Sequence, residues 1–245
     1  MSFSIHAGRA APGLRVFILS IALGFAALAT FPADPAQAVH AKSKVGPKTP
    51  RKPAAPPAEL ASEAATRVAE WVAGSGDNAA LPYIVIDKQA AALSLYDASG
   101  KLLGRAPVLL GIAKGDEASP GVGSKSLAKL GPAEKTTPAG RFLAKYGRAV
   151  GHDRVLWVDY SNSVALHAVV TSNPKERRLA RLQSPTADDN RISFGCINVP
   201  TAFYNQKIRP LYAKKGGMVY VLPETRPLEE IFPLMRGWPP KSPAA

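Results

Sequence analysis

The sequence predicts a mainly β domain with a few helices, an α+β fold. Tyr83 to Asp87 is rich in β-branched residues, and Ala92 to Tyr96 alternates apolar and polar side chains. The turn sequence Asp97 to Gly100 follows them. Short segments of this kind, bounded by turn residues, recur along most of the remaining chain, which favours β structure over helix.

Further strands are expected where apolar segments lie between turn residues. These segments are 101–110, 142–146, 155–160, 164–170, 192–199 and 217–222. Helices are expected at 59–73, where apolar residues recur at helical spacing before Gly74, and at 201–212 and 228–235.

Two long loops separate these elements. The first long loop, 111–140, is rich in Gly, Pro, Ser and Lys, and the second long loop, 171–190, holds a short helical stretch near 175–182. Long loops in a compact domain are usually functional, so we expect both to act as lids over a site.

Residues 1–38 have the features of an export signal. Arg9 and Arg15 precede an apolar stretch over 16–31, and Ala36-Gln37-Ala38 supplies small residues at cleavage spacing. An uncleaved anchor is the alternative, because the stretch nearly reaches the length that spans a bilayer. Cleavage after Ala38 is favoured, and either way we expect the rest of the chain in the periplasm or cell envelope.

Residues 39–58 form a linker of Pro, Lys and Ala, which favours extended conformations. The expected order is then a helix and connection at 59–80, a main domain at 81–223, and a helix and tail at 224–245. The net charge of +13 is dispersed, and export argues against a nucleic-acid partner. A solvated, non-specific role for this charge is favoured, with association of the basic linker with envelope or membrane surfaces as the alternative, and the protein is expected to be a monomer.

Cys196 is the only cysteine of the chain. An exported protein that uses cysteine for stability normally carries pairs, because a disulfide needs two. The position after Gly195 suggests a nucleophile on a tight turn, whereas a small buried hydrophobe is the alternative.

A thiol nucleophile needs a base, and histidine is the usual partner. His6 and His40 lie in the signal and the linker, which leaves His152 and His167. His152 lies in a turn-like sequence, whereas His167 ends an apolar strand. We therefore expect Cys196 and His167 to be the catalytic residues.

The neighbours of Cys196 suit acyl transfer. Backbone N–H groups at a tight turn stabilise an oxyanion, so Gly195 and Ser193 are expected to form or orient that site. Arg191 and Asn198 are expected to bind substrate, with ordinary hydrogen bonding near a turn as the alternative for Ser193 and Asn198. No convincing cluster of metal ligands is present in the sequence.

These residues resemble the signature of the L,D-transpeptidase (YkuD-like) family, a histidine, a variable stretch, then Ser-His-Gly-Cys-hydrophobic-Asn/Arg. The matching positions are His167, Ser193, Gly195, Cys196, Ile197 and Asn198. Residues 83–96 are similar to the opening hairpin of the family, and 137–142 to its Thr-Pro-x-Gly-x-Phe segment. The resemblance covers roughly 81–223.

The chain departs from the pattern in three places. Phe194 replaces the second histidine, Ala168 stands where a small polar residue or Gly is usual, and 29 positions separate His167 from Cys196, more than is typical. The second long loop is therefore an insertion beside the site. Because the family's base is generally its first histidine, the required pair is kept, and Phe194 is expected to alter substrate recognition or thiol tuning.

The resemblance implies a β-sandwich or barrel-like catalytic domain that takes part in peptidoglycan biosynthesis, cell wall organisation and cell shape. Its reaction is attack by the cysteine on a peptidoglycan stem tetrapeptide, with release of D-alanine and formation of a thioester. An amine then resolves the thioester, or water does so in a carboxypeptidase reaction. The family needs no metal or organic cofactor.

Two other functions are compatible with parts of the sequence. A damaged site on the same fold would give a peptidoglycan-binding or scaffold protein. A papain-like cysteine peptidase is less compatible, because such enzymes place the cysteine before the histidine in the chain, and here His167 comes first.

Overall fold

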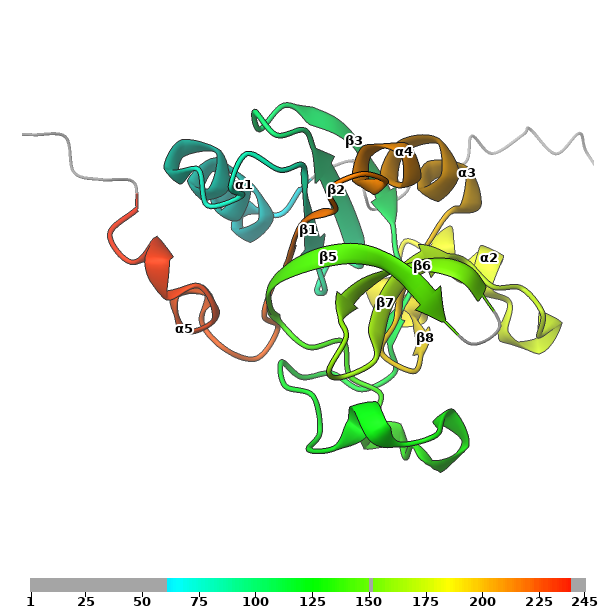
Figure 1. The fold of residues 1–245 in the computed structure, drawn as a ribbon. Helices are drawn as coiled ribbons and strands as arrows, with labels where there is room; N and C mark the ends of the chain where they lie inside the picture. Colours follow the sequence, from blue (N-terminus) through cyan, green and yellow to red (C-terminus); the bar gives the residue numbers. More distant parts are fainter. Residues whose placement is uncertain (1–60, 150–151, 239–245) are drawn as a thin grey trace, which may run out of the picture. The chain divides into compact units, whose positions relative to one another are not determined.

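The computed structural model describes residues 61–149 and 152–238 (Figure 1). Eight strands form one sheet in the order β3-β2-β1-β10-β5-β6-β7-β9. They are β1 (Tyr83–Asp87), β2 (Ala92–Tyr96), β3 (Leu102–Pro107), β5 (Gly140–Ala149), β6 (His152–Asp159), β7 (Val164–Ala168), β9 (Ile197–Val199) and β10 (Gly217–Val221). The expected export signal and linker lie outside the described residues.

The predicted mainly β fold with few helices is confirmed. β1 and β2 have the predicted bounds, and β5, β6, β7 and β10 differ from prediction by a few residues at their ends. The single strands expected at 101–110 and 192–199 are wrong, because each segment is interrupted and forms two strands. Two further strands, β4 (Leu110–Gly111) and β8 (Arg191–Ser193), form a separate parallel pair.

The chain after β3 nearly closes the large sheet into a barrel. Leu109 and Asn198 exchange two backbone hydrogen bonds, with N···O distances of 2.8 and 2.9 Å. Since Asn198 belongs to β9, this bridge connects the chain that leaves one edge strand to the other edge strand. The sequence around Cys196 lies beside this point of closure.

Side chains of β1 are buried on both faces of the sheet, which explains its unbroken apolar run. Ile84 and Ile86 belong to the core inside the curved sheet. Tyr83 and Val85 point the other way, into a second core with Trp71 of helix α1. Strands buried on both faces lose the alternation of apolar and polar residues.

Helix α1 (Glu63–Ser75) packs over this second core. The Ser62 side chain accepts a hydrogen bond from the Ala65 N–H at 3.1 Å and so caps the first turn, and Gly76 ends the helix in a left-handed conformation. The helix therefore begins four residues later than predicted. Within 61–149 and 152–238, no helix has the length and apolar character needed to cross a membrane.

The remaining helical segments are short. The α-helices are α2 (Arg178–Leu182) and α5 (Leu228–Ile231), and a continuous helical segment is formed by α3 (Thr201–Phe203), a π-helical turn (Tyr204–Ile208) and α4 (Arg209–Tyr212). Three 3₁₀ turns lie at Pro174–Glu176, Ala187–Asn190 and Pro233–Met235. The first long loop contains three 3₁₀ turns, Val122–Ser124, Leu127–Lys129 and Pro132–Glu134. Figure 1 shows this loop in green, projecting from the part of the sheet that carries β7, with β8 close by, and α2 in yellow in the second long loop.

Candidate functional site

The single strand expected at 192–199 is in fact two strands with a turn between them. β8 ends at Ser193 and β9 begins at Ile197, with Gly195 at a φ of +120° between them. A Cβ atom on Gly195 would lie 2.7 Å from the backbone oxygen of Thr136. Glycine alone adopts this conformation without strain and leaves that space. We call residues 193–196 the Cys196 turn. The backbone conformation of this turn therefore depends on Gly195.

The Ser193 hydroxyl holds the two ends of the Cys196 turn together. It donates to the Cys196 carbonyl at 2.6 Å and accepts from the Gly195 N–H at 3.1 Å. Ser193 is buried, so it shapes the turn from inside. Because the Gly195 N–H is bonded to Ser193, an oxyanion role for that N–H requires this bond to be exchanged.

Thr137 supports the same turn from the first long loop. Its hydroxyl donates to the Gly195 carbonyl at 2.8 Å and accepts from the Gly111 N–H at 2.9 Å. The Thr137 side chain is fully buried. One hydroxyl thus connects three segments that are far apart in the sequence.

The Cys196 sulfur is partly exposed and faces the start of β7. It lies 3.7 Å from the Ser163 carbonyl oxygen, to which the thiol donates. Burial raises the pKa of Cys196 above its ordinary value, and the Ala165 backbone N–H and the positive charge of Arg178 offset this only in part. The group is therefore a thiol at neutral pH, and a base has to remove its proton before attack.

His167 lies on the strand next to Cys196. β7 and β9 pair in parallel, with Leu166 opposite Ile197 and His167 opposite Asn198. Since Leu166 and Ile197 face the core, His167 and Asn198 share the other face of the sheet. Cys196 precedes Asn198 by two residues, which places its Cα about 7 Å along the strand direction from the level of His167.

The ring of His167 is oriented by the backbone. Its Nδ1 lies 2.8 Å from the Ala168 carbonyl oxygen. A carbonyl only accepts, so Nδ1 carries the proton, and Nε2 is the basic nitrogen of the neutral ring. This is the tautomer that a general base needs. His152, predicted in a turn, is instead the first residue of β6, and β7 separates that strand from β9.

Asn198 connects the Cys196 turn to the second long loop. The buried Asn198 amide donates from Nδ2 to the Cys196 carbonyl at 3.3 Å. Its Oδ1 accepts from Nη1 of Arg178 at 2.7 Å, and the Nε of Arg178 donates to Glu176. Nothing in the sequence pattern distinguished Arg178 from the other basic residues of the loop.

Arg191 is engaged in a buried network of charges. Its guanidinium forms an ion pair with Glu224 and donates to the Lys88 carbonyl at 3.2 Å, and its side chain is 8% exposed. The ammonium of Lys88 lies 2.8 Å from Asp116 and 3.5 Å from Glu224. Burial raises the pKa of Asp116, but hydrogen bonds from Lys88 and Thr225 outweigh it and hold that pKa well below its usual range. Substrate contact by Arg191 stays a prediction.

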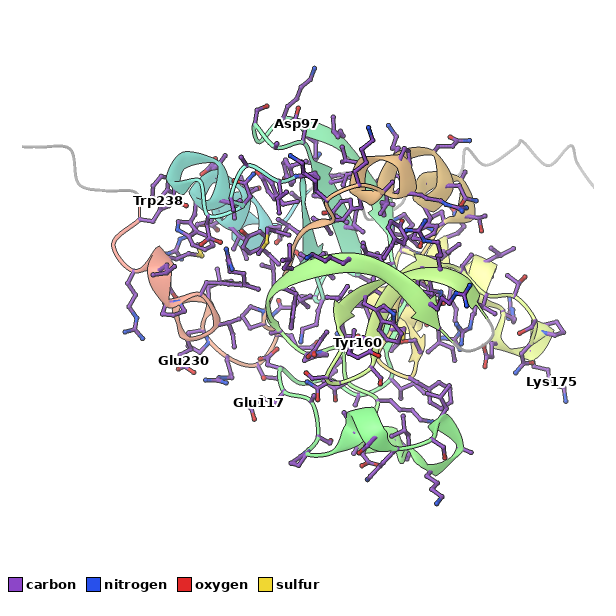
Figure 2. All side chains as sticks on the ribbon, viewed as in Figure 1. Asp97, Glu117, Tyr160, Lys175, Glu230 and Trp238 are labelled. Carbon is purple, nitrogen blue, oxygen red and sulfur yellow. The ribbon has the colours of Figure 1, made fainter. Side chains whose placement is uncertain are left out.

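Phe194 lies at the rim of the site. Its side chain is 37% exposed, and the Lys135 ammonium lies 4.0 Å from the centre of its ring. Tyr160, which is labelled in Figure 2, is the first residue of the turn that carries Ser163 and is also exposed. The first long loop contacts the turn that connects β6 and β7, since the Ser163 hydroxyl donates to the Gly123 carbonyl at 3.0 Å.

No protein-family model matches the chain, and no curated protein matches it. Among solved structures, it is similar to an L,D-transpeptidase from Xylanimonas cellulosilytica, with a TM-score of 0.34 and 16% identity over 58% of this chain and 60% of that one. It is also similar to the helical cell shape determining protein Pgp2 from Campylobacter jejuni, with a TM-score of 0.39 and 10% identity over 73% of this chain and 66% of that one. The chain thus spans less than two thirds of either structure.

Proposed function

We propose that the chain is an exported cysteine acyl-transferase of the L,D-transpeptidase (YkuD-like) type that acts on peptidoglycan stem peptides. Cys196 is the nucleophile and His167 the base. The observation that carries the proposal is the parallel pairing of β7 with β9, which sets the histidine of the motif beside the turn that bears the cysteine. The Nδ1 proton of His167 supports it, because Nε2 is left as the basic nitrogen.

The proposed reaction has two steps. Nε2 of His167 takes the thiol proton, and the sulfur attacks the carbonyl of the third, diamino-acid residue of a tetrapeptide. The C–N bond to the terminal D-alanine breaks, the amine leaves with the proton from His167, and a thioester remains. An amine from a second stem then attacks the thioester and restores the thiol, or water does so and yields a free carboxylate.

Mass spectrometry of the full chain after incubation with a carbapenem tests nucleophile and site together. We expect one adduct with the mass of the intact carbapenem, since opening of the β-lactam ring adds the whole molecule. Cys196→Ala should give none, and His167→Ala should slow its formation at least about a hundredfold. The absence of both an adduct and D-alanine release from disaccharide-tetrapeptide in the unmodified chain would overturn the proposal.

A peptidoglycan-binding protein with an impaired site is the second candidate. Two observations favour it, the raised pKa of the Cys196 thiol and the presence of Phe194 where the motif has a histidine. Phe194→His separates the candidates. A large gain in D-alanine release would show that the natural site is impaired, whereas unchanged or lower turnover of an active natural chain would eliminate this candidate.

A further inference from the structure

Arg178 is the cationic side chain of the second long loop that is held against the Cys196 site. It is the first residue of α2, and its side chain is only 11% exposed although the loop itself is largely exposed. Figure 2 shows Lys175, three positions earlier, at the outer end of this loop. Neighbouring basic residues of the loop thus point to different environments.

The guanidinium of Arg178 is fixed on two sides. Its Nε donates to Glu176, and its Nη1 donates to Oδ1 of Asn198 at 2.7 Å. An arginine held by two bonds in the plane of its guanidinium loses most of its freedom of rotation. Its charge is therefore kept in one place beside the turn.

The contact with Asn198 also sets the direction of that amide. Because Arg178 only donates, the atom facing it has to be the amide oxygen, and the NH₂ group points to the Cys196 carbonyl. Loss of Arg178 would remove one of the two groups that distinguish the ends of the amide. The orientation of the amide would then depend on the Cys196 carbonyl alone.

Charged and titratable groups of three elements lie around the turn. His167 lies on β7, Arg178 and its ion-pair partner Glu176 approach from the second long loop, and Lys135 of the first long loop contacts Phe194. Of these, Arg178 is held on the Asn198 amide, and its positive charge lowers the pKa of Cys196 against the larger opposing effect of burial.

We propose that Arg178 is a positioning residue for Cys196, which fixes the Asn198 amide and places a positive charge where the thiolate forms. This role deepens the proposed function, since it rests on Cys196 acting as a nucleophile. It also makes the second long loop part of the site, so that the insertion supplies a group on which the chemistry depends.

Alkylation by iodoacetamide tests this role without any peptidoglycan substrate. The chain has one cysteine, so the rate against pH reports the ionisation of Cys196 alone. Arg178→Gln keeps a hydrogen-bond donor and removes the charge. Arg178→Lys keeps the charge and loses the planar guanidinium that donates to both Glu176 and Asn198. Arg177→Gln is the matched control, because Arg177 is exposed and carries the same charge one position earlier.

We expect Arg178→Gln to lower the alkylation rate at pH 7 about threefold or more and to move the pH midpoint upward. Arg178→Lys should recover a large part of the rate, and Arg177→Gln should match the unmodified chain. Thermal unfolding of each variant checks that it is folded. Equal rates for Arg178→Gln and the unmodified chain across the pH range, or an equal loss in Arg177→Gln, would overturn the proposal.

This test is independent of the proposed function. If the unmodified chain forms no carbapenem adduct and releases no D-alanine while Arg178→Gln still slows alkylation, the transpeptidase assignment fails and the role of Arg178 stands. If the carbapenem adduct forms and Arg178→Gln alkylates normally, the opposite holds.

Discussion

Replacement of Thr137 by valine is the sharpest test of how the Cys196 turn is held. Valine has nearly the same shape but no hydroxyl, so it removes the bonds to the Gly195 carbonyl (2.8 Å) and the Gly111 N–H (2.9 Å) together. Both backbone groups stay behind without that partner. Each buried polar group left unpaired costs about 1–3 kcal/mol, which gives about 2–6 kcal/mol for the pair.

Urea unfolding followed by tryptophan fluorescence measures this loss. Thr136→Val is the matched control, because Thr136 is also buried but its hydroxyl makes only a long hydrogen bond, 3.5 Å, to the Ala133 carbonyl. The control should lose less than about 1 kcal/mol. If Thr137→Val is no less stable than Thr136→Val, the hydroxyl does not hold the turn and the reasoning is refuted.

Three further predictions concern the turn and the buried charges. Gly195→Ala should cost at least about 2 kcal/mol in urea unfolding, because its φ of +120° strains any other residue and its Cβ would meet the Thr136 oxygen; full stability would contradict the turn geometry. Lys88→Met should lower stability by about 3–5 kcal/mol, since Asp116 and Glu224 lose a buried cation, and calorimetry that finds an unchanged melting temperature would contradict this. The lowered pKa of Asp116 means that its contribution is present above the pKa of the unfolded chain and is lost as the pH falls; between about pH 5 and pH 2 the melting temperature of Asp116→Asn should therefore fall less than that of the unmodified chain.

The strands at 83–87 and 92–96 could be predicted at their bounds because burial of whole side-chain faces leaves a local pattern in the sequence. The tight turn beside Gly195 could also be predicted, but its division of 192–199 into two strands could not, because apolar residues continue on both sides of the glycine. What decides the break is the approach of the Thr136 backbone, a contact with no trace in the local sequence.

The burial and contacts of charged residues whose partners are distant in the sequence could not be predicted for the same reason. A lysine after a strand is normally solvated, yet Lys88 is fully buried because Gly115, Asp116 and Thr137 surround its ammonium, 27 to 49 positions away. Arg178 lies in a polar loop without periodicity, so only its contact with Asn198 reveals its place.

The parallel pairing of β7 with β9 has a consequence for how this protein can be altered. Backbone hydrogen bonds between the two strands set the spacing of His167 and Cys196, and the residues that connect the strands do not. The connection can therefore change in length or sequence without moving His167 relative to Cys196, provided that it still delivers a cation to Asn198. Under the proposed function, exchange of the second long loop is thus a route to new substrate preference with the same pair of residues.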